Sequence, residues 1–324
     1  MADLNPAVMK GFALTARFLK KEKMYYICET PEGLKKIYKT ADTAEKIHFQ
    51  HTVKEHCWDG GYVFIDRFTL SASGQPYFTA DGENFVMTPH VKSRETDFTS
   101  WDDVKQALEA AARFHAQARH VPLDGSPVAP PAFDAYLKKQ LAELNMTAKR
   151  VRKQPRLSDF DVLFIKNIHF YTEQLKDAIT RINQTDYAQR VQTACAETHI
   201  CHNALKEENL LLDNNNTHLH HFSCASVDAQ LNDIAAFIRR YAQRAGREAV
   251  PAARLVEAYD RVIPLSGAEL EIIYALLLYP LNFIKIVGQY YSKKRSWTPN
   301  AIINRMLSAV DEKDFYAGYI EGLR

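Results

Sequence analysis

The spacing of hydrophobic and polar residues changes near residue 90. Before it, short runs rich in Tyr, Ile and Phe alternate with turn-forming residues, which is typical of β-strands. We expect strands over residues 12–19, 24–29, 34–39, 62–70, 76–79 and 84–88. The last two would form a hairpin across Asp81-Gly82. One helix is expected from Thr43 to Trp58, with Asp42 as its N-cap and Gly60-Gly61 after its end.

After Pro89 the apolar residues recur with helical spacing, as Val104, Leu108, Ala111 and Phe114 do. Helices are expected over residues 101–119, 132–153, 159–182, 187–196, 231–245, 251–262, 268–292 and 298–310. The most apolar stretch, residues 272–287, is interrupted by Pro280 and two polar residues. It is too short and too interrupted to span a bilayer, so it predicts a buried core helix.

The helical spacing lapses between residues 199 and 222, where short strands are expected at 199–201, 210–212 and 217–222. The predicted architecture is therefore α+β. A small β-rich lobe with one helix (residues 1–90) precedes a large helical lobe (91–324), with a hinge near Pro89 to Arg94. This order of elements is that of a two-lobed protein-kinase-like fold, although a fold does not fix an activity.

The loop between the first two of those strands has the outline of a phosphotransferase catalytic loop, His-x-Asp-x-x-x-x-Asn. His202 and Asn209 match it, but Ala204 stands at the aspartate position. In kinases the aspartate accepts the proton of the attacking hydroxyl and the asparagine holds magnesium. An alanine methyl group can do neither. The alternative is a plain β-hairpin in which Asn209 caps a turn and His202 is a buried, hydrogen-bonded histidine.

A second acidic residue is expected after the third strand, where it would hold magnesium against the phosphates. The chain has His221 there, followed by Phe222 and Ser223. Imidazole is a poor substitute for carboxylate oxygen on magnesium, so no metal is expected. Four other acidic residues could replace the missing aspartates, but each is expected to be a solvated carboxylate on the surface: Glu207, Glu208, Asp213 and Asp228.

The small lobe also departs from a nucleotide-binding pattern. The turn Lys20-Lys21-Glu22-Lys23 has no glycine to let backbone N–H groups approach a phosphate. The strand over residues 34–39 points Tyr38 or Lys39 inward, depending on a one-residue register. Lys39 would pair with Glu45 on the helix. The predicted remnant of a nucleotide site is therefore Lys39, Glu45 and Asn209, and an inward Tyr38 would remove its lysine.

Two further clusters carry weaker signals. Histidines and cysteines gather within 26 residues: His199, Cys201, His202, His218, His220, His221 and Cys224. Zinc takes such ligands, but the spacing matches no C-x-x-C or H-E-x-x-H pattern, so packing and surface histidines are the favoured explanation of the cluster. The basic run 149–153, with Arg156, either binds an acidic partner or complements the dipole of a helix end.

The composition of the 324 residues narrows the class of protein. A net charge of +2 and 25% charged residues point to neither nucleic acid nor a membrane as a partner. The five cysteines lack C-x-x-C spacing, which favours a reducing compartment. Residues 1–10 contain no apolar segment of the kind found in secretory signal peptides, so no secretion by such a signal is expected.

A resemblance emerges from the order of several short motifs. They are Tyr26–Gly33 with Lys35 and Ile37, Thr43–Phe49, Ser73–Tyr77, Arg94-Glu95 with Asp97-Phe98, Phe114-His115, the loop of His202 and Asn209, and Asp233–Arg240. Over residues 10–245 the chain resembles CotS-type bacterial spore-coat proteins, which are related to aminoglycoside and choline phosphotransferases. The resemblance implies the kinase-like fold, other spore-coat proteins as partners, and a location in the spore coat or the mother-cell cytoplasm.

Together these observations predict a catalytically inactive, kinase-like protein with a structural or scaffolding role in the coat. No cofactor is expected beyond weak binding of ATP and magnesium. One alternative is an active ATP-dependent phosphotransferase of a small molecule or coat protein, with relocated acidic residues. Another is a zinc-dependent binding protein.

Overall fold

The computed structural model describes residues 4–14, 18–22, 24–125, 130–214, 216–292 and 299–323. The chain forms two compact units. Unit 1 takes residues 1–127, 196–227 and 261–263, and unit 2 takes 128–195, 228–260 and 264–324. This division does not coincide with the predicted one at residues 90 and 91, because the loop region 196–227 packs with the first 127 residues.

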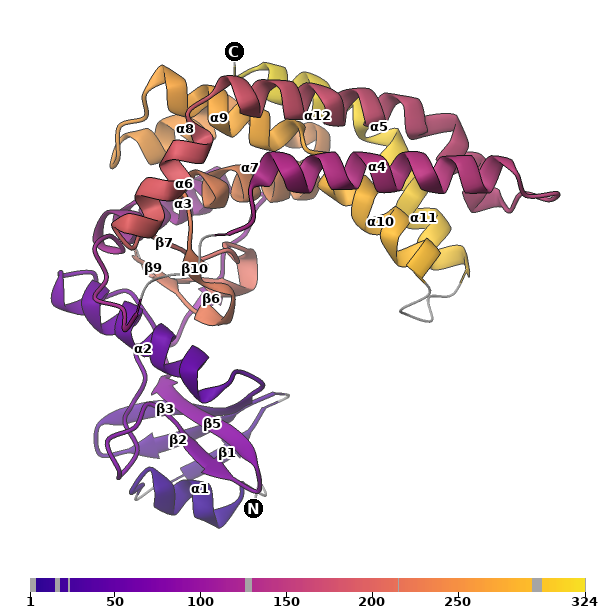
Figure 1. Ribbon diagram of the computed structural model, residues 1–324. Coiled ribbons are helices and arrows are strands. Elements are labelled where there is room, and N and C mark those ends of the chain that lie inside the picture. Colours follow the sequence, from indigo (N-terminus) through magenta and orange to yellow (C-terminus); the bar gives the residue numbers. More distant parts are fainter. Residues whose placement is uncertain are drawn as a thin grey trace. The chain divides into compact units, whose positions relative to one another are not determined.

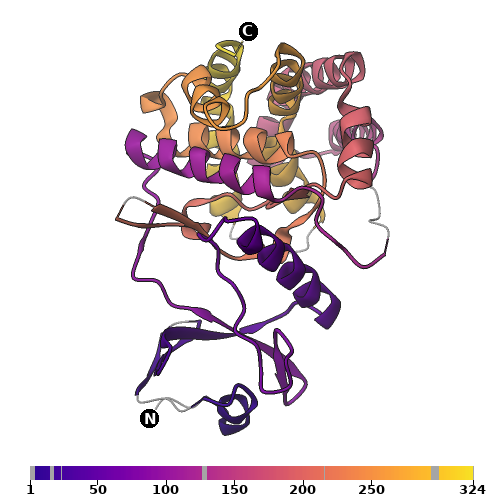
Figure 2. The same cartoon turned by 90° about the vertical axis from the view of Figure 1, so that its left-hand side faces the viewer.

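A five-stranded antiparallel sheet with strand order β1-β2-β3-β5-β4 forms the first part of unit 1. Its strands are β1 (Phe18–Lys21), β2 (Tyr26–Thr30), β3 (Gly33–Thr40), β4 (Phe78–Ala80) and β5 (Glu83–Pro89). Helices α1 (Pro6–Gly11) and α2 (Ala44–Asp59) lie on opposite faces of the sheet (Figures 1 and 2). Successive side chains of a strand point to opposite faces of the sheet, so each face has its own hydrophobic core. Ile37 and Met87 pack against Val8 of α1, whereas Val86 packs against Ile47 of α2.

The start of the chain differs from its prediction. The strand expected over residues 12–19 is preceded by α1, which Asn5 caps by accepting a hydrogen bond from the Ala7 N–H, and Phe12 is the residue after that helix. Proline at the first helical position favours this start. Only the end of the predicted strand is present, as β1, and residues 15–17 lie outside the described residues.

Two further predictions in the small lobe need correction. The N-cap of α2 is Thr43, whose side chain accepts from the Lys46 N–H, and not Asp42. The Asp42 carboxylate instead accepts from Gln50 and Ser223. Residues 62–70 form no regular strand; their one ladder contact is a parallel bridge between Ile65 and Leu219. The hairpin across Asp81-Gly82 is confirmed, with both residues at positive φ as a two-residue turn requires.

The remainder of unit 1 surrounds the loop over residues 202–209. It contains β6 (Arg94–Glu95), α3 (Trp101–Gln117), β7 (Ile200–Cys201), η1 (Glu207–Asn209), β8 (Leu210–Asp213), β9 (Asn216–Leu219), η2 (Phe222–Cys224) and β10 (Ser226–Val227). Strand β7 pairs with β10, whereas β8 lies between β6 and β9. The strands that flank the loop therefore have different partners, which excludes the plain hairpin.

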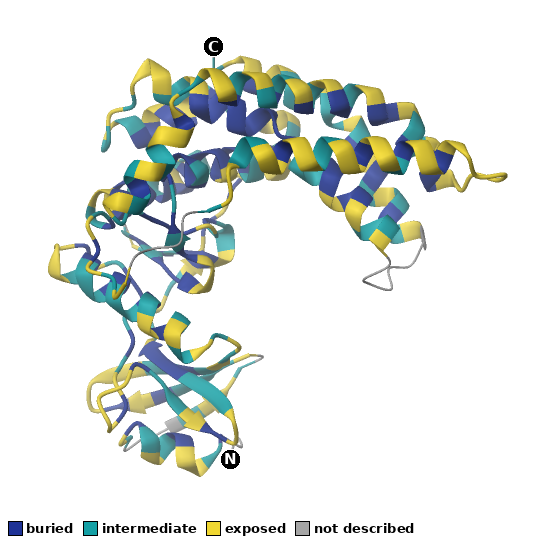
Figure 3. Cartoon of the chain, viewed as in Figure 1, coloured by how far each residue is buried: buried dark blue, intermediate teal, exposed yellow. Residues whose placement is uncertain are grey.

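Unit 2 is helical. It contains α4 (Phe133–Arg152), α5 (Asp159–Gln184), α6 (Tyr187–Ala196), α7 (Leu231–Ala245), η3 (Gly246–Glu248), α8 (Ala252–Asp260), α9 (Gly267–Leu278), α10 (Leu281–Ser292), α11 (Pro299–Asp311) and α12 (Lys313–Glu321). Helices α5 and α7 pack on α9, whose residues 272–278 are all buried (Figure 3). Ser158 and Ser266 begin α5 and α9 with capping boxes.

The predicted helix over residues 268–292 is in fact two helices, because Pro280 falls between α9 and α10. The segment is long and apolar enough to cross a membrane, but 72% of its most apolar window is buried inside the protein. It therefore serves as a core element, as the sequence indicated. The basic run predicted at 149–153 lies at the end of α4, where Lys149, Arg150 and Arg152 occupy the last turn.

Candidate active site

A cleft of about 620 Å³ lies within unit 1. Its walls come from the residue before β2, from β3, from the end of β5 and the segment through β6, from the loop over residues 202–209 and β8, and from the segment after β9. The lining residues are Tyr25, Lys36, Pro89, His90, Val91, Ser93, Glu95, Ala204, Lys206, Glu208, Asn209, Leu211, His220, His221, Ser223 and Cys224. The volume is in the range of small-molecule sites, and the degenerate motif positions 204, 209 and 221 all lie on it.

Asn209 closes the loop on itself. Its side-chain amide donates to the Ala204 carbonyl at 2.9 Å, and its own carbonyl accepts from the His220 N–H at 2.9 Å. The side chain is almost fully buried. The loop therefore has a fixed backbone shape, but at position 204 it presents a methyl group where proton transfer would need a carboxylate.

His202 is fully buried beneath the same loop. Its Nε2 lies 3.0 Å from the His220 carbonyl oxygen, and its ring meets Phe222 edge to face with centroids 4.5 Å apart. The ring thus joins the loop to the segment that follows β9. The buried-histidine alternative is right about this side chain, although the hairpin that accompanied it is not formed.

His221 occupies the expected metal position in a left-handed backbone conformation, with φ of 61°. Its N–H donates to Asp66 Oδ2 at 3.2 Å, and its ring meets the Tyr38 ring edge to face at 5.8 Å. Burial lowers the pKa of this imidazole. A neutral ring in this place offers magnesium no anionic oxygen.

A buried ion pair missed by the sequence-based interpretation lies next to His221. Lys54 Nζ of α2 is 2.8 Å from Asp66 Oδ1, and the two side chains are 0% and 2% exposed. Lys54 also donates to the Asp66 carbonyl at 2.9 Å. Burial alone would raise the pKa of Asp66, but Lys54, with help from His220, holds it below its usual value. Asp66 accepts the backbone N–H of His221 at the expected metal position, yet Lys54 balances its charge and it does not line the cleft.

The acids near the cleft fix the segment 220–225, which we call the latch segment. Asp66 accepts the His221 N–H, and the Asp42 carboxylate accepts from Ser223 Oγ at 2.7 Å. Lys46 of α2 donates to the Ala225 carbonyl. Three contacts from the small lobe thus hold this segment in one conformation.

The structure settles which residue of β3 points inward. Tyr38 packs with Ile47, Phe68 and Val86, and burial raises its pKa well above the usual value. Lys39 points away, is 56% exposed and pairs with Glu83 at 2.8 Å. The expected Lys39–Glu45 pair is therefore wrong; Glu45 is exposed in the first turn of α2.

Lys36 was not singled out from the sequence, although it shares a strand face with Tyr38. Its side chain lines the cleft, and its ammonium lies 4.3 Å from the centre of the Tyr25 ring. Burial lowers its pKa. Period-two alternation along β3 was the signal that could have identified it once Tyr38 was placed inward.

The four acidic residues suggested as replacements for the missing aspartates lie in different places. Glu208 lines the cleft with Glu95, and its carboxylate is 2.7 Å from Lys206 Nζ. Asp213 pairs instead with His218 at 3.1 Å, and Asp228 belongs to unit 2. Glu207 is a member of η1 and is not among the cleft-lining residues the structure describes.

Among the residues that the structure describes, the histidines and cysteines of the predicted cluster form no three-ligand group with one another. Cys201 is buried in β7, His218 pairs with Asp213, and Cys224 is exposed at the cleft. Of the predicted charged turn over residues 20–23, Lys20 and Lys21 belong instead to β1. Lys20 pairs with Glu22, and Lys23 lies outside the described residues.

Solved structures show the same fold. An aminoglycoside phosphotransferase from Alicyclobacillus acidocaldarius matches with a TM-score of 0.88 at 15% identity, covering 100% of this chain and 96% of that one. Spectinomycin phosphotransferase APH(9)-Ia, in complex with ADP and spectinomycin, matches at 0.62 and 9% identity over 94% and 96%. Choline kinase from Cryptosporidium parvum Iowa II matches at 0.53 and 11% identity over 99% and 93%. The α+β, kinase-like fold predicted from the sequence is confirmed.

A search of the curated proteins finds no match. The family model described as "Spore coat putative kinase YutH", by contrast, matches residues 6–323, nearly the whole chain. The degenerate loop, the latch segment and nearly all of both units fall inside that match. The chain belongs to this family of spore-coat, kinase-like proteins.

Proposed function

We propose that this protein is a catalytically inactive, kinase-like component of the bacterial spore coat, with a structural or scaffolding role. The observation that carries the proposal is the state of Asp66. This carboxylate accepts the backbone N–H of His221 at the expected metal position, and Lys54 balances its charge in a fully buried pair. Positions 204 and 221 supply a methyl group and a neutral imidazole.

The energetic consequence is large. A positioned general base contributes roughly 10²–10⁴-fold to a rate, and the magnesium that neutralises developing phosphoryl charge is a separate contribution. Recruiting Asp66 to a metal would leave Lys54 as an unpaired buried cation, which costs about 3–5 kcal/mol. The pair therefore opposes a return to catalysis.

The cleft itself remains a binding site in this proposal. Lys36 and Lys206 give it positive side chains, and its volume of about 620 Å³ suits a nucleotide-sized ligand. Weak binding of ATP would stabilise one conformation of the protein without turnover. The partners that such a conformation would favour are other spore-coat proteins, reached in the spore coat or the mother-cell cytoplasm.

The decisive experiment measures phosphate release and ATP-dependent thermal shift, with and without magnesium. We expect no turnover above background from the natural protein. The matched variant is the double substitution Ala204→Asp/His221→Asp, which restores both acids; aspartate tolerates the left-handed backbone at 221. We expect this variant to gain magnesium-dependent ATP binding. Robust turnover by the natural protein, abolished by Asn209→Ala, would overturn the proposal.

One observation favours an active phosphotransferase as the second candidate. Glu95 and Glu208 line the same cleft as Asn209, so two carboxylates are available near the loop. If they replaced the missing acids, Glu95→Gln and Glu208→Gln would each remove a magnesium-dependent activity. The ion pair of Glu208 with Lys206 makes the inactive protein the better-supported reading.

The coat assignment needs its own test. A fluorescent fusion in sporulating cells should localise to the forespore surface, and crosslinking should recover coat proteins. The double variant Lys54→Met/Asp66→Asn removes both charges while leaving the cleft-lining residues in place. Loss of coat localisation in this variant, with folding intact, would connect the latch segment to assembly.

A further inference from the structure

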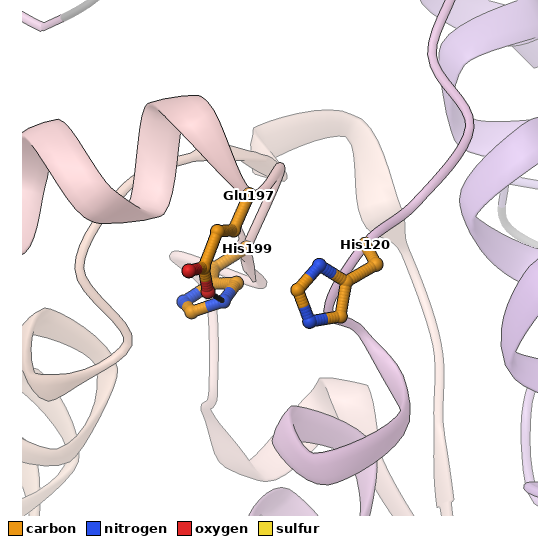
Figure 4. Close-up of side chains that lie close together, drawn as sticks. All are labelled: His120, Glu197 and His199. Atoms are coloured by element: carbon orange, nitrogen blue, oxygen red, sulfur yellow. Dashed lines mark ion pairs between the residues drawn. The ribbon is translucent and has the colours of Figure 1, made fainter.

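Three side chains of types that can bind a metal ion converge outside the cleft, on unit 1. They are His120, just after α3, and Glu197 and His199, just before β7. One ligand atom from each lies within 4.8 Å of the others. Figure 4 shows the His120 ring turned toward the Glu197–His199 pair. His199 belongs to the histidine and cysteine cluster predicted from the sequence, whereas His120 and Glu197 do not.

Backbone hydrogen bonds hold the two contributing segments together. The His120 N–H donates to the Glu197 carbonyl, and the Ile200 N–H donates to the Ala118 carbonyl, both at 2.8 Å. The Thr198 hydroxyl donates to the Val121 carbonyl, also at 2.8 Å. The spacing of the three ligands is therefore set by the backbone rather than by flexible side chains alone.

The backbone at this place is unusual. His120 and Thr198 both have positive φ, at 55° and 50°. A β-branched residue such as threonine rarely adopts this conformation, and such outliers cluster at functional sites. With Thr198 in this conformation, the side chains on either side of it meet: His199 Nε2 lies 3.0 Å from Glu197 Oε2.

The geometry is close to that of a tetrahedral metal site. Ligand atoms bound tetrahedrally to zinc at about 2.0–2.2 Å stand about 3.3–3.6 Å apart from one another. The His199–Glu197 distance of 3.0 Å is already near this range. The His120 ring stands edge-on to His199 with centroids 5.8 Å apart, so a small side-chain rotation brings its nitrogen into range.

The ligand types select the ion. Two imidazoles and one carboxylate suit zinc, whereas magnesium prefers oxygen ligands throughout. His120 and Glu197 are exposed and His199 is half-buried, so an ion can enter from solvent and keep a water as its fourth ligand. An ion pair between Glu197 and His199 accounts for those two residues alone; it does not account for the third ligand facing them.

We propose that His120, Glu197 and His199 form a zinc site on unit 1. The bound ion joins the end of α3 to the segment that leads into β7 and the degenerate loop. It is a stabilising site with three protein ligands and one water, separate from the cleft and independent of whether the cleft turns over ATP.

The test is zinc titration of the metal-stripped, full-length protein by calorimetry, with cobalt absorption as a report of tetrahedral coordination. We expect one equivalent bound, unaffected by excess magnesium. His120→Ala and Glu197→Gln should each lose at least about tenfold in affinity, since even outer-shell partners contribute that much. Both side chains are exposed. Alanine is strained at the positive φ of His120, so the melting temperature of each metal-free variant is measured alongside, and Glu197→Gln tests the site without that strain.

A matched control exists in α5. His169 pairs with Glu173 at 3.8 Å, is 87% exposed, and belongs to no three-ligand group among the residues that the structure describes. His169→Ala should leave the zinc affinity unchanged. Failure to bind zinc, or binding that His120→Ala and His169→Ala affect equally, would overturn the proposal.

Discussion

Two lysine–carboxylate pairs in the small lobe share their chemistry and their length but differ in burial and in what they connect. Lys54–Asp66 and Lys39–Glu83 both have an N···O distance of 2.8 Å. The first is buried and connects α2 to the latch segment through His221, whereas the second is about half exposed, on β3 and β5. The comparison shows that the position of a charge pair, rather than its length, decides its structural weight.

The largest expected effect is at the buried pair. Lys54→Ala leaves Asp66 as an unpaired buried charge, and we expect the free energy of unfolding to fall by about 3–5 kcal/mol. Urea unfolding measures it. The double variant Lys54→Met/Asp66→Asn, which removes both charges, should recover much of the loss. A change below about 1 kcal/mol for Lys54→Ala would mean that the pair resembles a surface one.

The second effect is a pH dependence next to that pair. Burial lowers the pKa of His220 to about 4, although Asp66 opposes the shift. Lys36, Lys54 and His221 also face this ring and disfavour its charged form.

Between about pH 6.5 and 4 the unfolded chain binds a proton at His220 that the folded protein does not. Stability should therefore fall as the pH falls through this window, by up to about 3 kcal/mol. Unfolding free energies measured across the window should show a flatter dependence for His220→Asn. His169→Asn, on an exposed residue, should keep the slope of the natural protein. Identical slopes for all three proteins would contradict the assignment to His220.

The sequence revealed most of the fold because the helical and strand periods are strong there. The helix at 187–196 and that at 231–245 were predicted to the residue, and the kinase-like order of elements followed from the pattern. The exact ends of helices were harder to predict, because neighbouring polar residues compete for the capping position. Thr43 rather than Asp42 caps α2, since the Asp42 carboxylate accepts hydrogen bonds from Gln50 and Ser223. Pro280 divides one predicted helix into two.

The site was harder to predict because the contacts that the sequence did not reveal join segments that are far apart in the chain. Ala204, Asn209 and His221 could be recognised by spacing within one loop region. The Lys54–Asp66 pair joins a helix to a segment that had been interpreted as a strand. No local pattern indicates that a lysine on a helix will be fully buried, so this contact required the tertiary structure.

A smaller effect tests the start of α2, the helix that carries Lys54. Thr43→Ala removes the hydrogen bond that the Lys46 N–H donates to the cap. We expect a loss of about 1 kcal/mol in the free energy of unfolding. Thr43→Ser keeps the oxygen and should behave as the natural protein. Thermal or chemical unfolding distinguishes the two, and equal destabilisation by both would point to the lost methyl group instead.

The smallest effect is expected at the exposed pair. Lys39→Ala removes an ion pair that solvent screens, so the free energy of unfolding should change by no more than about 0.5 kcal/mol.

The same substitution, compared with Lys36→Ala, tests which of these two lysines would bind a nucleotide. Lys36 lines the cleft, whereas Lys39 is held by Glu83 on the outer side of the sheet. If ATP binds, calorimetry should show weaker binding for Lys36→Ala and unchanged binding for Lys39→Ala. The reverse result would restore the sequence-based assignment of Lys39 to the nucleotide site, and it would require β3 to present its opposite face to the ligand.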